Sequence, residues 1–322
     1  MNKISVTAVI AIGAAFSIAQ AQDFCQTAAH SGNKVTLSTN KVGSFDNGIG
    51  YELWNEGGNG GSATFYDDGS FSCDMTGAKD YLCRSGLSFN SDKTHTEIGH
   101  MLADFKLVKS NLNGIDYSYI GIYGWTREPL VEWYIVDNTG SQYMPGDWVA
   151  QGSSAKKHGT FTIDGAEYTV YEGDRTSYSI DGDNKYFKQY FSVRKSPRDC
   201  GTIDISAHFK KWEELGLKMG KMHEAKILGE AGSTSGANAR GSYDFPYAKV
   251  YIESSEPFEG IAQIKSVNRD RAYSVFDMQG RFMCTLEQEA GMPLNDLVKA
   301  GVKKAGSYIV KGGAGTSVVT IK

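Results

Sequence analysis

The sequence predicts an all-β fold, a β-sandwich or jelly roll with a single α-helix, followed by a small C-terminal β-sandwich-like module. Three observations predict it. The 322 residues contain 38 glycines, only 6 prolines and many aromatic residues. From Val35 to about Ile252 short alternating segments are separated by turn residues, as in "GSATFYDDGSFSCDM" and "GTFTIDGAEYTVYEG". One segment alone has helical spacing. The net charge of −4 gives no support to a nucleic-acid partner.

The N-terminal segment has the pattern of a secretory signal peptide over residues 1–21. Lys3 is followed by a short apolar core and the small-residue pattern Ala19-Gln20-Ala21, which predicts cleavage before Gln22. A retained membrane anchor is the alternative, but the apolar run is short for a span. No later segment is long and apolar enough to cross a bilayer. We therefore expect a secreted or cell-surface protein.

The five cysteines fit an exported protein, in which disulfides are permitted. Cys73 and Cys83 lie in two short strands around a turn, so we expect a bridge across that hairpin. Cys25–Cys200 is the second expected pair, and Cys284 then stays unpaired. The cysteine spacing does not match common zinc sites, and the six histidines form no cluster. We expect no metal.

The helical segment "ISAHFKKWEELG" places Phe209, Trp212 and Leu215 at helical spacing. Ser206 is a possible N-cap and Gly216 a stop signal. Later, "SSEPFEG" reads as a linker. The predicted organisation is a main domain over residues 22–253, a linker over residues 254–262 and a β module over residues 263–322.

One strand predicts a row of aromatic side chains. In "IDYSYIGIYGW" strand alternation puts four aromatic residues on one face and small apolar residues on the other: Tyr117, Tyr119, Tyr123 and Trp125 against Ser118, Ile120, Ile122 and Gly124. Rings with polar tips suit sugars, because C–H faces stack on the ring and hydroxyls meet the phenols. An ordinary sandwich face has the same pattern, so both interpretations stay open.

A carboxylate interrupts the apolar strand "WTREPLVEWYIVDN". Glu132 shares its face with Leu130, Tyr134 and Val136, and an uncompensated carboxylate there is costly. Glycoside hydrolysis usually needs a second carboxylate. In "EAKILGEAGSTSG" both Glu224 and Glu230 qualify, and the residues alone do not choose between them.

Several motifs together resemble the glycoside hydrolase family 11 xylanases. "YGWTREPLVEWYIVDN" resembles the family's nucleophile strand, "QYFSVR" the strand after its thumb loop, and "ILGEAGSTSG" its acid/base strand. "TFTIDGAEYTVYEGDRTSYSIDG" and "GTIDISAHFKKWEELGLKMG" resemble the strand leading into the thumb and the helix. The resemblance covers roughly Val35 to Ile252.

The resemblance implies a jelly roll of two curved antiparallel sheets and endo-hydrolysis of β-1,4-xylan with retention of configuration. Glu132 matches the nucleophile and Glu230 the general acid/base, with the carboxyl groups about 5–5.5 Å apart. The family's substrate-binding residues are matched by Trp54, Tyr119, Tyr123, Tyr134, Arg175, Gln189 and, beside the acid/base, Asp74. No cofactor is implied. The expected partners are xylan and xylo-oligosaccharides. We expect the protein itself to be a monomer.

The chain departs from the family pattern in several places, among them Glu224, which replaces a tyrosine on the leaving-group side, and "SGLSFNSDKTHTEIGHMLADF". Tyr178 stands where the thumb usually has proline, and Gly232 replaces a tyrosine after the acid/base. "IVDNTGSQYMPGDWVAQG" contains an insertion-like stretch with Trp148. Subsite preferences therefore do not follow from the resemblance.

The tail resembles the C-terminal sorting modules of bacterial proteins exported by the type IX route, through "YSVFDMQGR" and "GSYIVK". A plain appended β-sandwich is the alternative. For the whole chain, a β-1,4-glucanase and a carbohydrate-binding lectin or adhesin without turnover are the alternative functions. The second glutamate argues against the lectin, because binding alone needs no second carboxylate.

Overall fold

The computed structural model describes residues 24–57, 59–253, 272–277, 282–287, 294–302, 305–312 and 315–321. The chain divides into two compact units, residues 1–255 and 256–322. The expected signal peptide over residues 1–21 and the expected linker over residues 254–262 lie outside the described residues.

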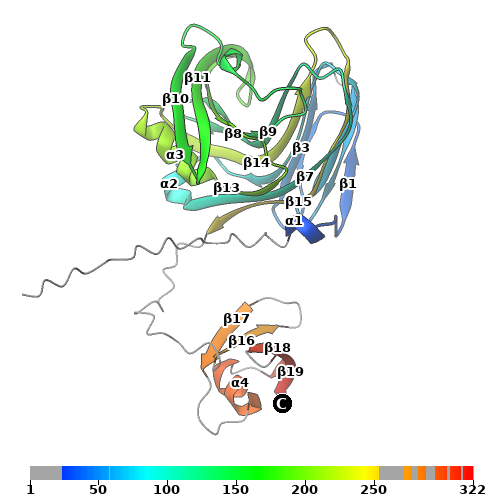
Figure 1. Ribbon diagram of the computed structural model, residues 1–322, viewed down its shortest axis with the longest axis vertical. Coiled ribbons are helices and arrows are strands. Elements are labelled where there is room, and N and C mark those ends of the chain that lie inside the picture. Colours follow the sequence, from blue (N-terminus) through cyan, green and yellow to red (C-terminus); the bar gives the residue numbers. More distant parts are fainter. Residues whose placement is uncertain are drawn as a thin grey trace, which may run out of the picture. The chain divides into compact units, whose positions relative to one another are not determined.

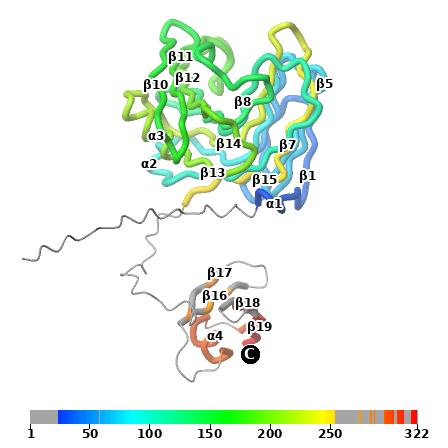
Figure 2. The backbone as a smooth tube through the Cα atoms, in the orientation of Figure 1, coloured from blue at the N-terminus to red at the C-terminus, as the bar shows by residue number. Residues whose placement is uncertain are grey.

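Two large β-sheets form the first unit (Figures 1 and 2). The larger has nine strands in the order β10 (Lys156–Ile163), β11 (Ala166–Ser179), β12 (Gly182–Arg194), β9 (Val131–Asn138), β8 (Tyr117–Arg127), β14 (Lys221–Gly232), β6 (Asp80–Ser88), β3 (Gly50–Asn55) and β2 (Lys41–Ser44). The smaller has six, in the order β1 (Lys34–Leu37), β4 (Gly61–Tyr66), β5 (Phe71–Ala78), β15 (Ala239–Glu253), β7 (His100–Asn113) and β13 (Cys200–Asp204). All pairs are antiparallel except β9 and β12, which are parallel.

The nine-stranded sheet is buried on both faces along its central strands. On β8, Ile120 and Ile122 belong to the core between the two sheets. Tyr119, Tyr123 and Trp125 point to the opposite face and form a second cluster with Tyr134 and other residues there. The alternation expected for this strand is therefore confirmed. The second cluster provides the wall of the site described below.

Helix α3 (Ile205–Glu214) is the helix that the sequence predicts, but its N-cap is not Ser206. Asp204 is the N-cap, and its Oδ1 accepts a 2.8 Å hydrogen bond from the Ala207 amide. The Ser206 hydroxyl instead accepts a bond from the Met101 amide. Gly216 has φ +85° after the last turn, which confirms the expected stop. Three short elements were not expected: α1 (Phe24–Thr27), α2 (His95–Ile98) and the 3₁₀ turn η1 (Asp147–Val149).

Both expected disulfides, Cys25–Cys200 and Cys73–Cys83, are present. The reasoning from a hairpin was wrong, however. Cys73 lies in β5 of the six-stranded sheet and Cys83 in β6 of the nine-stranded sheet, because the chain changes sheet between them. The Cys73–Cys83 bridge therefore joins the two sheets through the core. The side chain of Cys284 lies outside the described part of the chain.

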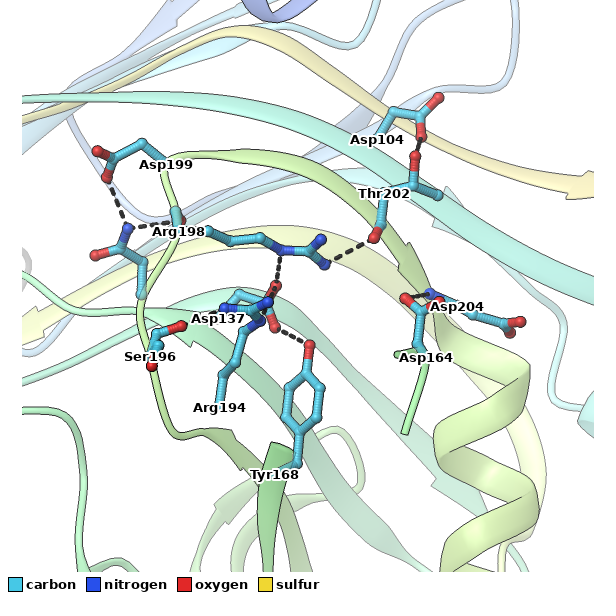
Figure 3. A network of polar contacts seen from close by, with 11 residues as sticks. Asp104, Asp137, Asp164, Tyr168, Arg194, Ser196, Arg198, Asp199, Thr202 and Asp204 are labelled. Atoms are coloured by element: carbon cyan, nitrogen blue, oxygen red, sulfur yellow. Dashed lines mark hydrogen bonds and ion pairs between the residues drawn. The ribbon is translucent and has the colours of Figure 1, made fainter. Parts of the chain in front are cut away.

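A buried polar network fixes the end of β9 (Figure 3). Asp137 is fully buried and accepts hydrogen bonds from the Tyr168 hydroxyl at 2.7 Å and the Arg198 Nε at 2.5 Å. Arg194 Nε lies 3.9 Å from the same carboxylate. Arg198 also donates to the Thr202 carbonyl. The network ties β9 to β11 and to the segment that leads into β13.

The second unit is one antiparallel sheet with a helix against it. The sheet has the order β17 (Phe282–Glu287), β16 (Ala272–Asp277), β18 (Gly306–Gly312) and β19 (Gly315–Ile321). Helix α4 (Leu294–Val302) packs on β17 and β19, and Val298 joins Val275 and Val310 in a small core. The sheet was expected and the helix was not. Within the described residues, no helix is long and apolar enough to pass through a membrane.

Candidate active site

The site lies on the face of the nine-stranded sheet that points away from the six-stranded sheet. Strand register brings its side chains into rows, because directly opposite residues share a face. Trp54, Leu82, Glu230 and Tyr119 are opposite one another on β3, β6, β14 and β8. Glu224, Trp125, Glu132 and Gln189 form another such row on β14, β8, β9 and β12.

Two adjoining cavities, of about 530 and about 570 Å³, open over these rows. The first extends from Glu230 to Trp148. The second contains Trp54, Glu132 and Glu230. Asp80, Tyr134, Arg175 and Glu230 line both, so the cavities meet at the carboxylates.

Glu132 is a buried carboxylate with three hydrogen-bond donors. Tyr123 Oη donates to Oε1 at 2.8 Å and Tyr134 Oη at 3.2 Å, while Gln189 Nε2 donates to Oε2 at 2.6 Å. Burial raises the pKa of Glu132 above its ordinary value, and these donors together with the charge of Arg175 hold that rise back. The sequence expectation that something compensates this carboxylate is confirmed.

Glu230 has the opposite environment. It is 4 % exposed, and its Oε2 has no hydrogen-bond partner among the described residues. Burial and the nearby charges of Asp80 and Glu132 raise its pKa well above the ordinary value. The two glutamates therefore differ: three hydrogen-bond donors hold back the rise in the pKa of Glu132, whereas neighbouring carboxylates add to the rise in the pKa of Glu230.

Asp80, and not Asp74, is the aspartate beside Glu230. Asp74 lies exposed on β5 of the six-stranded sheet, so the sequence assignment was wrong. Asp80 begins β6 and lies opposite Gly232, two residues from Glu230. Burial raises its pKa to about 6, while hydrogen bonding from Tyr117 opposes the rise. The sequence signal was available in the alternation of "DYLCR", which puts Asp80 and Leu82 on one face.

The other predicted substrate-binding residues all line the cleft: Trp54, Tyr119, Tyr123, Tyr134, Arg175 and Gln189. The β11–β12 hairpin, which matches the thumb, forms one side through Tyr178, Ser179 and Ile180. Arg127 holds its tip, with Nε 2.6 Å from Asp181 Oδ1 and Nη2 donating to the Ile180 carbonyl.

Glu224, the rival to Glu230, belongs to a buried ionic cluster that sequence reasoning missed. Arg84 Nη2 lies 2.7 Å from Glu52 Oε2 and 3.3 Å from Glu224 Oε1. Lys226 donates to Glu224 Oε2. These cations lower the pKa of Glu224 to about 2 despite its burial, so it stays ionised. Glu224 is therefore unsuited to donate a proton, which leaves Glu230.

The cluster also reaches Glu132 through Tyr123. The Arg84 guanidinium lies 4.6 Å from the centre of the Tyr123 ring, and the Tyr123 hydroxyl donates to Glu132. Chemically, the cleft holds an aromatic wall, a hydrogen-bonded carboxylate and a second carboxyl group whose pKa is raised by burial and by neighbouring carboxylates. That arrangement can perform acid-assisted nucleophilic displacement on a sugar.

Comparison with known proteins finds one family model and several relatives. A family model described as glycosyl hydrolases family 11 matches residues 46–241. The chain is 67% identical over 231 residues to endo-1,4-beta-xylanase A of Piromyces sp, covering 72% of this chain and 36% of that protein. It is 64% identical over 242 residues to the bifunctional acetylxylan esterase/xylanase XynS20E of Neocallimastix patriciarum, covering 75% and 35%. The chain thus spans little more than a third of the length of these two relatives.

A solved structure, the wild-type ENZbleach xylanase, matches with a TM-score of 0.63 at 34% identity. The match covers 71% of this chain and 90% of that one.

Proposed function

The chain belongs to glycosyl hydrolases family 11, and from this membership we propose that it is an endo-β-1,4-xylanase that cleaves internal bonds of xylan with retention of configuration. Both relatives described above are named as xylanases. The observation that carries the proposal is the contrast between Glu132 and Glu230 within one cleft.

Glu132 is the nucleophile in this proposal. Its three donors stabilise the carboxylate, and Arg175 adds a positive charge. The carboxylate oxygen attacks the anomeric carbon as the bond to the leaving sugar breaks, and Glu230 gives its proton to the departing oxygen. A glycosyl ester on Glu132 is the result.

Glu230 then acts as the base. Forming the ester removes the negative charge of Glu132, which is one of the causes that raise the pKa of Glu230. The pKa of Glu230 therefore falls in the intermediate, after it has given up its proton. Glu230 takes a proton from water, the water attacks the anomeric carbon, and the ester bond to Glu132 breaks.

The test compares the full chain with its Glu132→Gln variant on purified xylan, following reducing ends and the anomer first released. We expect the β-anomer from the wild type and a loss of at least roughly a thousandfold in the variant. Glu167→Gln, an exposed glutamate of β11 paired with Lys195, is the matched control and should keep its activity. Release of the α-anomer would exclude retention. Cleavage of a soluble cellulose derivative but not of xylan would indicate a glucanase, and binding without cleavage a lectin.

We further propose that the protein is exported. Residues 1–21 fit a signal peptide, and two disulfides fit an oxidising compartment. In this proposal the C-terminal unit serves as a sorting module of the type IX kind. Deleting residues 256–322 should then retain the xylanase inside the cell, which fractionation of the source organism would detect.

A further inference from the structure

We propose that Arg84 is a positioning residue for the reaction, which acts through the Tyr123 ring to keep the Tyr123 hydroxyl on the nucleophile Glu132. The inference rests on the proposed retaining hydrolysis and deepens it, because it adds a residue that is not itself a hydrogen-bond donor to Glu132. None of the motifs that carry the family resemblance includes Arg84.

The Arg84 guanidinium lies against the face of a ring on another strand. Arg84 belongs to β6 and Tyr123 to β8, with β14 between them. The side chain reaches across β14, and its guanidinium carbon lies 4.6 Å from the centre of the Tyr123 ring. A cation over an aromatic face is attracted by the ring, more strongly where both groups are shielded from water. Arg84 and Tyr123 are both buried, so the contact holds the plane of the ring.

The plane of the Tyr123 ring decides whether its hydroxyl reaches the nucleophile. Trp125 Nε1 donates to the Tyr123 hydroxyl oxygen, so the single hydroxyl proton is free for Glu132 Oε1 at 2.8 Å. Tyr134 packs edge-on against the ring, with centroids 4.9 Å apart and an angle of 70° between the planes. A phenol is rigid, so a ring that tilts moves its hydroxyl away from Glu132. Arg84 opposes that tilt.

The guanidinium is itself fixed by two carboxylates. Glu52 lies directly opposite Arg84 on β3, with its Oε2 2.7 Å from Arg84 Nη2, and Glu224 Oε1 lies 3.3 Å from the same nitrogen. Lys226 donates to the other oxygen of Glu224. Two cations thus balance two anions. Apolar residues of similar volume are often as stabilising as such a buried cluster, so the cation that it places on Tyr123 better explains its presence in the cleft.

The electrostatic consequence can be measured at Glu132. Burial raises the pKa of Glu132, and the hydrogen bond from Tyr123 opposes that rise together with Gln189, Arg175 and Tyr134. When the Tyr123 ring is no longer held, only its own contribution weakens, and the other three remain. The pKa of Glu132 then rises. The carboxylate also becomes a less well oriented nucleophile.

The experiment is a double-mutant cycle between the cluster and Tyr123. The variant with Arg84→Met and Glu52→Gln keeps the charge of the cluster balanced, because Glu224 retains Lys226. The substrate is 2,4-dinitrophenyl β-xylobioside, whose leaving group departs without a proton from Glu230, so kcat/KM reports the attack by Glu132. We expect kcat/KM to fall roughly tenfold, since a bond to a charged group is weakened.

The same pair of substitutions should cost less than about twofold in the Tyr123→Phe background, where no hydroxyl is left to position. The matched control is Lys195→Met with Glu167→Gln, an exposed ion pair that lines neither cavity. It should leave kcat/KM unchanged. Urea unfolding shows that each variant is folded under the assay conditions.

A full loss of about tenfold in the Tyr123→Phe background overturns the inference, because Arg84 then acts directly on the substrate. A loss below twofold with Tyr123 present, or an equal loss in the control pair, also overturns it. If the wild type hydrolyses no xylan or xyloside, the proposed function fails instead. Arg84 is then judged by carbon-13 NMR of the Glu132 carboxyl group, whose signal is assigned by its absence in Glu132→Gln. The pKa should rise in the charge-balanced variant only when Tyr123 is present, and an unmoved pKa contradicts the inference.

Discussion

Glu132 and Gln189 lie directly opposite each other on the parallel strands β9 and β12, and Gln189 Nε2 donates a 2.6 Å hydrogen bond to Glu132 Oε2. This is the shortest of the three bonds to that carboxylate. The only parallel pair among the described strands of the two large sheets thus supports the nucleophile from the side that Tyr123 and Tyr134 do not reach. Hydrogen bonds to a charged group are stronger than neutral ones.

Replacing Gln189 by leucine should shift the acidic limb of the pH profile to higher pH. Burial already raises the pKa of Glu132, and the Gln189 bond lowers it. Without that donor the pKa rises further, so Glu132 is ionised only at higher pH. Loss of a bond to a charged group costs about 1.5–3 kcal/mol, or roughly a 10- to 150-fold fall in kcat/KM near neutral pH. The dependence of kcat/KM on pH reports this.

The control for this variant is Gln142→Leu, a glutamine exposed to solvent. Gln142→Leu should not shift the dependence of kcat/KM on pH. An acidic limb that is unmoved in Gln189→Leu, despite a lower rate, would mean that Gln189 orients substrate without tuning the charge of Glu132.

Removing the charge of Glu132 should lower the pKa of Glu230. The Glu132→Gln variant abolishes one of the charges that raise it, whereas burial and Asp80 remain. The pKa of Glu230 should therefore fall without reaching its ordinary value. Carbon-13 NMR of labelled glutamate carboxyl groups in both proteins measures the shift. Asp74→Asn is the matched control, because that carboxylate is exposed on the other sheet.

Much of the site could be predicted from alternation along single strands. The tyrosines of β8 and the face shared by Glu132, Tyr134 and Val136 follow from the period of two residues. A carboxylate in such a strand needs compensation, and its donors are present. These features need no knowledge of which strands are neighbours.

The predictions that failed concern residues whose neighbours in the sheets are far away in the sequence. Asp80 is placed beside Glu230 by the pairing of β6 with β14, about 150 residues later. Asp74 was misassigned because the chain changes sheet between β5 and β6, a step that no local pattern marks. The cluster of Arg84 and Glu224 joins the same two strands, and each residue alone resembles an ordinary surface charge. The positions of Asp80, of Asp74 and of this cluster all follow from which strands pair in the two sheets.

Replacing Arg84 by methionine should destabilise the fold. Arg84 is buried and neutralises Glu52 and Glu224, whose charges would stay in the interior without it. Removing one partner of a buried ion pair typically costs 3–5 kcal/mol, so the free energy of unfolding should fall by roughly that amount. Urea unfolding at pH 7 measures it.

The matched rescue is the double variant with Arg84→Met and Glu52→Gln. It leaves Glu224 with Lys226 and removes the charge that lost its partner. We expect it to recover at least about 1 kcal/mol relative to Arg84→Met alone. A double variant that is less stable than the single one would show that the packing of the guanidinium on Tyr123, and not its charge, stabilises the site.

The two disulfides should contribute unequally to stability. Cys25–Cys200 closes a loop with a sequence separation of 175, and Cys73–Cys83 one of 10. In the chain-entropy account, a cross-link stabilises by restricting the unfolded chain, more so for longer loops. Replacing both cysteines of a pair by serine should therefore cost about 5 kcal/mol for the long loop and about 2.7 kcal/mol for the short one.

Denaturant unfolding of the two double-serine variants gives both values under the same conditions. The measured loss also depends on burial. Cys73–Cys83 joins the two sheets within the core, whereas Cys200 is only partly buried. Serine at positions 73 and 83 would add the cost of burying two hydroxyls. A larger loss from the short loop would therefore show that packing between the sheets outweighs chain entropy. Alanine in place of serine at those two positions would separate the two causes, since it buries no hydroxyl.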